Sequence, residues 1–92
     1  MQQNYPNPFN PSTIIPFSVP FSPTGSVPVT VEIYNMLGQQ VRHIFDRDVE
    51  PGFRKVFWDG LDGSGAVVGS GVYFYKVQVG QEALVGSMTM KK

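Results

Sequence analysis

The stretch VPVTVEIY, residues 27–34, alternates apolar and polar side chains more strictly than any other part of the chain. Its odd-numbered positions are valine or isoleucine, whereas proline, threonine, glutamate and tyrosine occupy the even-numbered ones. Successive side chains of a β-strand point to opposite faces of the sheet, so this period of two predicts a strand with one buried face. The stretch therefore decides the fold in favour of β-structure packed on one side.

The same period recurs on both sides of this stretch. It predicts further strands over residues 14–19, 40–45, 55–58, 73–79 and 83–90, with 46–52 as a polar connection and a short apolar run at 66–68. Gly38 suits the tight reversal after the first stretch, and the broken alternation at His43-Ile44 indicates a bulge. Short strands at this spacing, with no helical window, predict an all-β antiparallel sandwich of about seven strands. The residues expected to share its core are Val31, Ile33, Trp58, Tyr73 and Tyr75.

Length and composition narrow the range of functions. The chain has 92 residues, with seven basic and seven acidic side chains, one histidine and no cysteine. The balanced charge argues against binding to nucleic acid or anionic membranes through net charge. The missing cysteines exclude disulfides and thiolate metal sites, and the single histidine excludes histidine-pair sites. Ten glycines and eight prolines, about a fifth of the chain, argue against a helical bundle.

The loop Asp59–Gly65 is the one carboxylate cluster that resembles a metal site. The calcium-loop pattern needs oxygen ligands at alternate positions and a distal glutamate, but Leu61 occupies the third position and no glutamate follows. We expect a turn in which Asp59 and Asp62 bond backbone amides, with bound calcium as the open alternative. Neither these aspartates nor His43 forms a recognisable catalytic arrangement, so no catalytic residue, cofactor site or small-molecule substrate is predicted.

Three aromatic residues are expected to point outward from their strands. They are Tyr34, Phe57 and Phe74. An exposed, coplanar set of such rings stacks sugars in carbohydrate-binding modules, whereas cross-strand aromatic pairs are also common in sheets for structural reasons. Exposure in one plane favours a sugar-binding module, and burial argues against it.

Residues 1–13 form a proline- and asparagine-rich arm ahead of the domain, which we place at residues 14–92. Prolines at 6, 8 and 11 favour an extended, polyproline-like chain. This arm either packs Tyr5 or Phe9 against the flank of the domain or is bound directly by a partner. It has neither the basic nor the apolar region of a signal peptide, so an export signal would lie elsewhere.

The motifs together resemble the C-terminal sorting domains of the bacterial type IX secretion system, over nearly the whole chain. The resemblance runs through NYPNPFNPST at 4–13, VEIYNMLGQQV at 31–41, WDG at 58–60 and SGVYFY at 70–75, with Asp62 and Met88. Its motif and structural positions are Asn4, Pro6, Asn7, Pro8, Phe9, Asn10, Pro11, Trp58, Gly60, Gly65, Gly71, Tyr73 and Tyr75. The sandwich is also similar to the immunoglobulin-like domain of flagellar hook-capping proteins. One departure is Ser87, where the sorting domains often carry a basic residue.

The resemblance implies an immunoglobulin-like domain without catalytic activity. Such a domain lies at the C-terminus of a larger secreted protein, which enters the periplasm by a separate N-terminal signal, and the folded domain is recognised by an outer-membrane translocon. A sortase-like peptidase then removes it, and the cargo is secreted or held at the cell surface. The candidate recognition residues are Leu37, Gly38, Gln39, Asp59, Asp62, Lys91 and Lys92. The alternatives are an accessory module, either carbohydrate-binding or a structural spacer, of a secreted enzyme.

Overall fold

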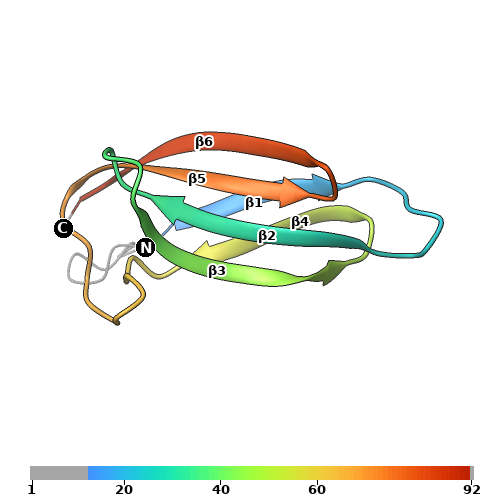
Figure 1. The fold of residues 1–92 in the computed structure, drawn as a ribbon, viewed down its shortest axis with the longest axis horizontal. Coiled ribbons are helices and arrows are strands. Elements are labelled where there is room, and N and C mark those ends of the chain that lie inside the picture. Colours follow the sequence, from blue (N-terminus) through green and yellow to red (C-terminus); the bar gives the residue numbers. More distant parts are fainter. Residues whose placement is uncertain (1–12, 92) are drawn as a thin grey trace, which may run out of the picture.

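The computed structural model describes residues 13–91, which form six β-strands (Figure 1). The strands are β1 (Thr13–Val19), β2 (Val27–Tyr34), β3 (Gln40–Val49), β4 (Gly52–Trp58), β5 (Gly71–Val79) and β6 (Glu82–Met90). No helix in this part of the chain has the length and hydropathy to cross a membrane. The predicted all-β class is confirmed.

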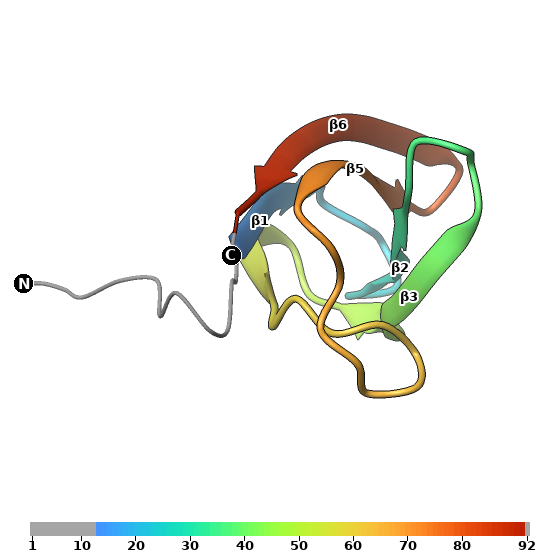
Figure 2. The same cartoon turned by 90° about the vertical axis from the view of Figure 1, so that its left-hand side faces the viewer.

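The strands form two antiparallel sheets that face each other (Figure 2). One sheet has two strands in the order β1-β4, and the other has four in the order β3-β2-β5-β6. Strands β2 and β5 are distant in sequence but pair from Val29↔Val79 to Tyr34↔Phe74. The centre of the larger sheet is therefore built from non-local contacts.

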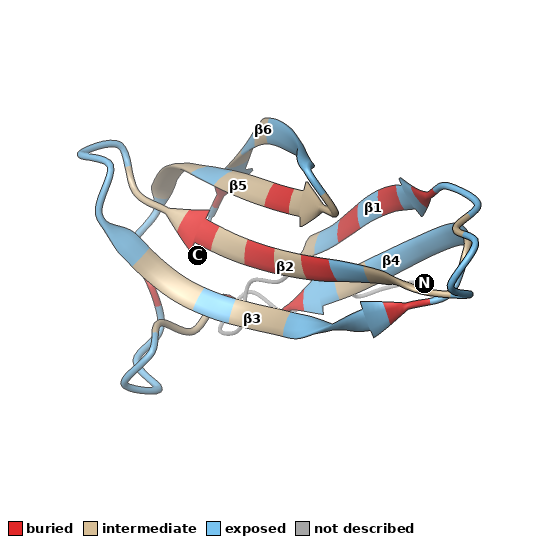
Figure 3. Ribbon diagram, turned by 45° about the vertical axis from the view of Figure 1, so that its right-hand side comes forward, coloured by how far each residue is buried: buried red, intermediate tan, exposed pale blue. Residues whose placement is uncertain are grey.

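The core lies between the sheets and is filled from alternate positions of the strands (Figure 3). Val29, Val31 and Ile33 of β2 are buried, as their period of two predicts. Trp58, at the end of β4, is fully buried, and its ring packs edge-to-face on Tyr73 with 5.7 Å between centroids. The expected shared core is confirmed, with Tyr73 and Tyr75 partly buried at its margin.

Strand number and strand limits differ in part from the prediction. Residues 13–91 contain six strands where about seven were expected, and Leu61 and Val67 form only an isolated bridge. The sequence predicts residues 46–52 as a connection, but residues 46–49 extend β3 because they pair with residues 27–30 of β2. Asp46 and Asp48 face outward, and Arg47, opposite buried Val29, is polar as well, so no apolar alternation marks this segment as a strand.

The bulge predicted at His43-Ile44 is present. Along β2, Val31 pairs with Phe45 and the next residue, Glu32, pairs with His43, so Ile44 is the extra residue. A second register shift follows between Ile33 and Tyr34. Such irregularities increase the local twist of an edge strand and disturb its outer hydrogen-bonding groups.

Candidate functional site

The turn between β2 and β3 is organised by one amide side chain. Asn35 Oδ1 accepts hydrogen bonds from the backbone N–H groups of Leu37 (2.9 Å) and Gln39 (3.0 Å). The Asn35 carbonyl accepts from Gly38 N–H at 3.0 Å, and Asn35 N–H donates to the Gln39 carbonyl at 3.0 Å. Gly38 has a φ of +82°, as its predicted role requires. The turn therefore holds Met36 and Leu37, which are 70% and 83% exposed, in a fixed position.

The loop after β4 repeats the same hydrogen-bond pattern around Asp62. Its Oδ1 accepts from the N–H groups of Ser64 (2.9 Å) and Ala66 (3.0 Å), and also from Ser64 Oγ (2.7 Å). The Asp62 carbonyl accepts from Gly65 N–H, and Asp62 N–H donates to the Ala66 carbonyl. Gly65 has a φ of +90°, close to that of Gly38. The expected turn with an aspartate bonding backbone amides is present.

These hydrogen bonds also set the charge of the loop. The Ser64 hydroxyl, followed by the backbone N–H groups of Ala66 and Ser64, lowers the pKa of the Asp62 carboxyl below its usual value. Each of these bonds favours the ionised carboxylate. Asp62 therefore holds its loop as an anion at neutral pH.

Asp59 anchors the start of this loop to the neighbouring sheet. Its Oδ1 accepts from Arg42 Nη1 of β3 and from Leu61 N–H, both at 3.0 Å. The Leu61 carbonyl accepts from Arg42 Nη1 at 2.8 Å and from Trp58 Nε1 at 3.0 Å. The indole N–H of buried Trp58 and the guanidinium of Arg42 therefore both donate to the Leu61 carbonyl. Sequence analysis missed Arg42 because 17 residues separate it from Asp59.

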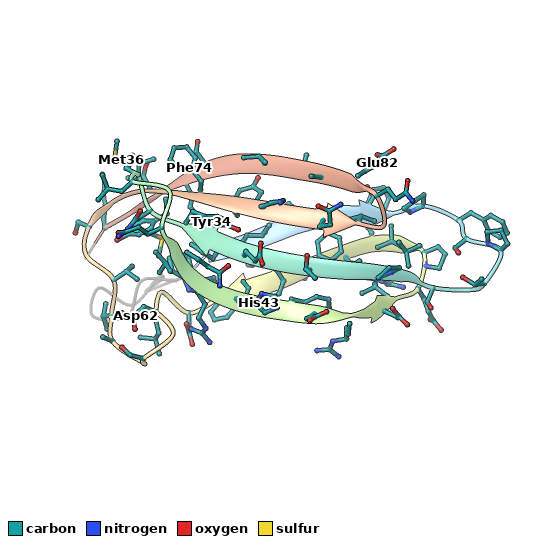
Figure 4. All side chains as sticks on the ribbon, in the orientation of Figure 1. Tyr34, Met36, His43, Asp62, Phe74 and Glu82 are labelled. Atoms are coloured by element: carbon teal, nitrogen blue, oxygen red, sulfur yellow. The ribbon has the colours of Figure 1, made fainter. Side chains whose placement is uncertain are left out.

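Residues of both turns line one open hollow of about 650 Å³. Its walls include Asn35 and Gln39 from the first turn, Asp62 and Ser64 from the second, and Tyr73. Both turns lie at the end of the sandwich where β6 also ends, as the labelled Met36 and Asp62 show (Figure 4). Exposed Lys91 follows β6 at this end, whereas Lys92 lies outside the described residues. The fold thus gathers the candidate recognition residues from three segments, and adds Met36, whose exposure beside Leu37 the sequence did not reveal.

Glu32, Tyr34 and His43 lie close together on the outer face of the larger sheet. Glu32 accepts from the Tyr34 hydroxyl at 2.7 Å and lies 3.3 Å from His43 Nδ1. The tyrosine hydrogen bond is the largest cause of a lowered Glu32 pKa, and the same bond raises the pKa of Tyr34. Within residues 13–91, no group of three or more histidine or carboxylate side chains is arranged to hold a metal ion.

The three outward aromatic residues do not form one surface. Tyr34 and Phe74 are cross-strand partners on β2 and β5. Phe57 belongs to β4 in the other sheet, where it is 60% exposed. A coplanar set of all three, the arrangement that would favour a sugar-binding module, is therefore not formed. The alternation assigns each residue to one side of its own strand but does not assign the strand to a sheet. Two neighbouring rings remain.

Of the motif residues, those in the N-terminal arm lie outside the described part of the chain, whereas the glycines after β4 lie within it. Asn4, Pro6, Asn7, Pro8, Phe9, Asn10 and Pro11 lie outside the described residues. Gly60 and Gly71 have φ values of +79° and +149°, so both adopt backbone conformations that favour glycine. For Gly71, as for Gly38, the sequence predicts a backbone conformation that residues with a Cβ avoid, and its φ confirms this prediction.

Comparison with known proteins gives a consistent picture of the fold. A family model described as the FlgD Ig-like domain matches residues 13–83. The structure is similar to FlgD from P. aeruginosa, with a TM-score of 0.64, 22% identity, and coverage of 86% of this chain and 59% of that one. It is also similar to dimeric latent PorU from Porphyromonas gingivalis, with a TM-score of 0.70, 25% identity, and coverage of 96% and 9%. No curated protein sequence matches the chain.

Proposed function

The chain belongs to the FlgD Ig-like domain family, and on that premise we propose that it is a non-catalytic sorting domain of the type IX secretion system. It directs an N-terminal cargo across the bacterial outer membrane. Its partners are the outer-membrane translocon and a sortase-like peptidase, and the cargo is secreted or displayed at the cell surface. The motifs that resemble type IX sorting domains support this proposal, as does the similarity of the fold to a small part of latent PorU from Porphyromonas gingivalis.

The observation that carries the proposal is the matched pair of turns at one end of the sandwich. A signal that is read in its folded form needs exposed residues whose positions are fixed before binding, since this lowers the entropy cost of association. The turns at 35–39 and 62–66 meet this need with eight backbone-directed hydrogen bonds, four in each turn. Between them they present an apolar tip, Met36-Leu37, and a carboxylate, Asp62.

The proposal is tested by fusing residues 1–92 to a periplasmic reporter in a host that has this secretion system. We expect the reporter to reach the cell surface, and Leu37→Ser to reduce this delivery without unfolding the domain. Phe21→Ser is the matched control because Phe21 is 84% exposed but lies in the loop between β1 and β2, at the opposite end of the sandwich. Equal delivery by Leu37→Ser and Phe21→Ser would show that the turn at 35–39 is not recognised. Retention of the wild-type fusion in the periplasm would contradict the proposed sorting function.

A carbohydrate-binding accessory module is the second candidate. It is favoured by the adjacent rings of Tyr34 and Phe74 on the outer face of the larger sheet. Tyr34 is partly exposed and Phe74 is 36% exposed, so the two rings offer a small platform. Binding of soluble polysaccharide by the wild-type domain, lost in Phe74→Ala but kept in Phe57→Ala, would establish this function in place of sorting.

A further inference from the structure

The outward face of the smaller sheet is apolar and exposed. Residues that are directly opposite on antiparallel strands share a face of the sheet. On β1 and β4 the outward pairs are Ile14 with Phe57, Pro16 with Lys55 and Ser18 with Phe53. Phe53 is 90% exposed, Phe57 60% and Ile14 55%. Figure 3 shows buried and exposed residues alternating along β1, so the second set of side chains projects away from the core.

These side chains form one continuous patch. Phe53, Lys55 and Phe57 occupy alternate positions of one strand, about 13 Å from the first to the last. Pro16 lies opposite Lys55, between the two rings. Scattered apolar residues are normal on a protein surface, but a contiguous apolar patch marks a contact surface.

The charge of the chain is divided unevenly between the two sheets. Strands β1 and β4 hold two of the seven basic residues, Arg54 and Lys55, and none of the seven acidic ones. The rest of the chain carries five basic residues against seven acidic ones. The balanced net charge therefore conceals a smaller sheet that is positive. A partner that approaches this sheet meets an apolar surface with basic side chains and no carboxylate.

An open hollow of about 540 Å³ lies on this side of the domain. It is lined by Pro16, Phe53, Arg54 and Lys55. The Arg54 guanidinium donates to the backbone carbonyls of Glu50 (3.2 Å) and Pro51 (3.0 Å), so its charge is held at the start of β4. Within residues 13–91, Lys55 has no ion-pair partner. The two cations favour a phosphate, and a hollow of this size holds a small polar headgroup.

The face offers little that would orient a folded protein partner. Protein interfaces contain about one hydrogen bond per 100–200 Å². The outward side chains of β1 and β4 provide only the Ser18 hydroxyl and the Lys55 ammonium group for such bonds. A lipid surface needs no directional partner, because apolar side chains enter between the headgroups while basic ones are attracted to anionic lipids. Exposed rings beside two cations therefore favour a lipid surface over a protein.

We propose that the outward face of β1 and β4 docks on the surface of an anionic phospholipid bilayer. Phe53 and Phe57 enter the headgroup region, and Arg54 and Lys55 lie at the level of the phosphates. The outer face of the larger sheet is then turned away from the bilayer. This inference goes beyond the proposed function and does not depend on it, because vesicle binding requires no secretion machinery.

Cosedimentation of the full chain with lipid vesicles tests the rings and the charges separately. The wild type should bind vesicles of phosphatidylcholine that contain about a third phosphatidylglycerol, and binding should fall as salt is raised. Phe53→Ser should weaken binding at least ~10-fold, and Lys55→Gln about fivefold. Phe74→Ser and Lys76→Gln are the matched controls, because they make the same changes on the outward side of β5 in the larger sheet. Both controls should bind like the wild type.

Tryptophan fluorescence locates the contact independently. Trp58 is the one tryptophan of the chain and is fully buried, so it gives a constant background. Phe53→Trp places a second indole on the proposed face. With the anionic vesicles, its emission should shift to shorter wavelength, and lipids brominated in their acyl chains should quench it. Phe74→Trp should show neither change.

Absence of wild-type binding to the anionic vesicles would overturn the proposal. Equal weakening by Phe53→Ser and Phe74→Ser would also overturn it, because the two residues lie on different sheets. A wild-type dimer that does not bind vesicles and that Phe53→Ser dissociates would assign the face to a second copy instead. Quenching in Phe53→Trp but not in Phe74→Trp would establish the proposed orientation.

Discussion

The turn at 35–39 and the turn at 62–66 have the same backbone hydrogen bonds but different chemistry. In both, the Oδ1 of an asparagine or aspartate accepts hydrogen bonds from two backbone N–H groups, and a glycine of positive φ follows three residues later. The first turn is held by a neutral amide and displays Met36 and Leu37, whereas the second is held by a carboxylate and displays glycine and serine. A common scaffold can therefore present an apolar tip in one turn and a carboxylate in the other, at the same end of the sandwich.

The largest effect expected concerns the anchor that only the second turn has. Trp58 is fully buried and its indole N–H donates to the Leu61 carbonyl, just before Asp62. Trp58→Ala should cost ~3–5 kcal/mol of unfolding free energy through the cavity and the lost packing on Tyr73. Denaturant unfolding measures this cost. Amide exchange should show more loosening at Ala66 than at Gln39, and equal loosening would mean that both turns depend only on global stability.

The glycines test whether the two turns are equivalent as backbone structures. At Gly38 and Gly65 an added Cβ would meet nothing within 4 Å, so a substitution is penalised by the positive φ rather than by a clash. Gly38→Val and Gly65→Val should each cost ~1–3 kcal/mol, and by similar amounts. Gly71→Val, at φ +149°, should also destabilise. An unchanged melting temperature in Gly38→Val or Gly65→Val would show that the backbone of that turn relaxes to negative φ.

Acid should separate the two turns. The pKa of Asp62 is lowered in the folded state, so its contribution is present above the ordinary aspartate pKa of 3.8 and is lost as the pH falls through the lowered value. Amide exchange at Ala66 should therefore rise at low pH, after correction for the intrinsic rate, whereas exchange at Gln39 should not. Asn35 does not titrate and provides the internal control.

Reciprocal substitutions sharpen this expectation. Asp62→Asn keeps an oxygen acceptor and should remove the acid response of the second turn, whereas Asn35→Asp should give the first turn a new one. The responses are read from the amides of Ala66 and Gln39 in each variant. If Asp62→Asn kept the wild-type acid response, the carboxylate would not be its source.

The smallest effect on stability is expected beyond the turns, at the chain end. Lys91→Ala with Lys92→Ala should change stability by no more than ~0.5 kcal/mol, because Lys91 is exposed and follows the last strand. Export of a fused reporter should nevertheless fall if these charges speed the encounter with an acidic partner, with a dependence on salt. If the double lysine variant were exported as well as the wild type, recognition would be restricted to the turns. If substitutions at Leu37 and Asp62 also left export unchanged, the sorting function would be contradicted.

Much of the fold followed from local patterns. The period of two in residues 27–34 places Val29, Val31 and Ile33 inside, and the broken alternation at His43-Ile44 marks the bulge. The continuation of β3 through residues 46–49 was missed because its side chains are mostly polar. An edge strand with one solvated face does not need the alternation on which the prediction relied.

The candidate site was predictable only in pieces. The Asn35–Gln39 turn and the Asp59–Gly65 loop each have local sequence signals, namely Asn or Asp followed by glycine three residues later. Their meeting in the wall of one hollow depends on the tertiary structure, including the pairing of β2 with β3 and β5. The Arg42–Asp59 ion pair depends on the packing of the two sheets and has no signal in sequence spacing.

The sequence by itself determined the strands, the buried face of each and the glycines of the turns, because alternation and backbone sterics act over a few residues. Only the tertiary structure decided which strands share a sheet. That choice separated Phe57 from Tyr34 and Phe74 and placed the two turns at one end. The physical reason is that hydrogen bonds between distant strands and the burial of their apolar faces are made together. A local pattern specifies that a face must be covered, but it does not specify by which strand.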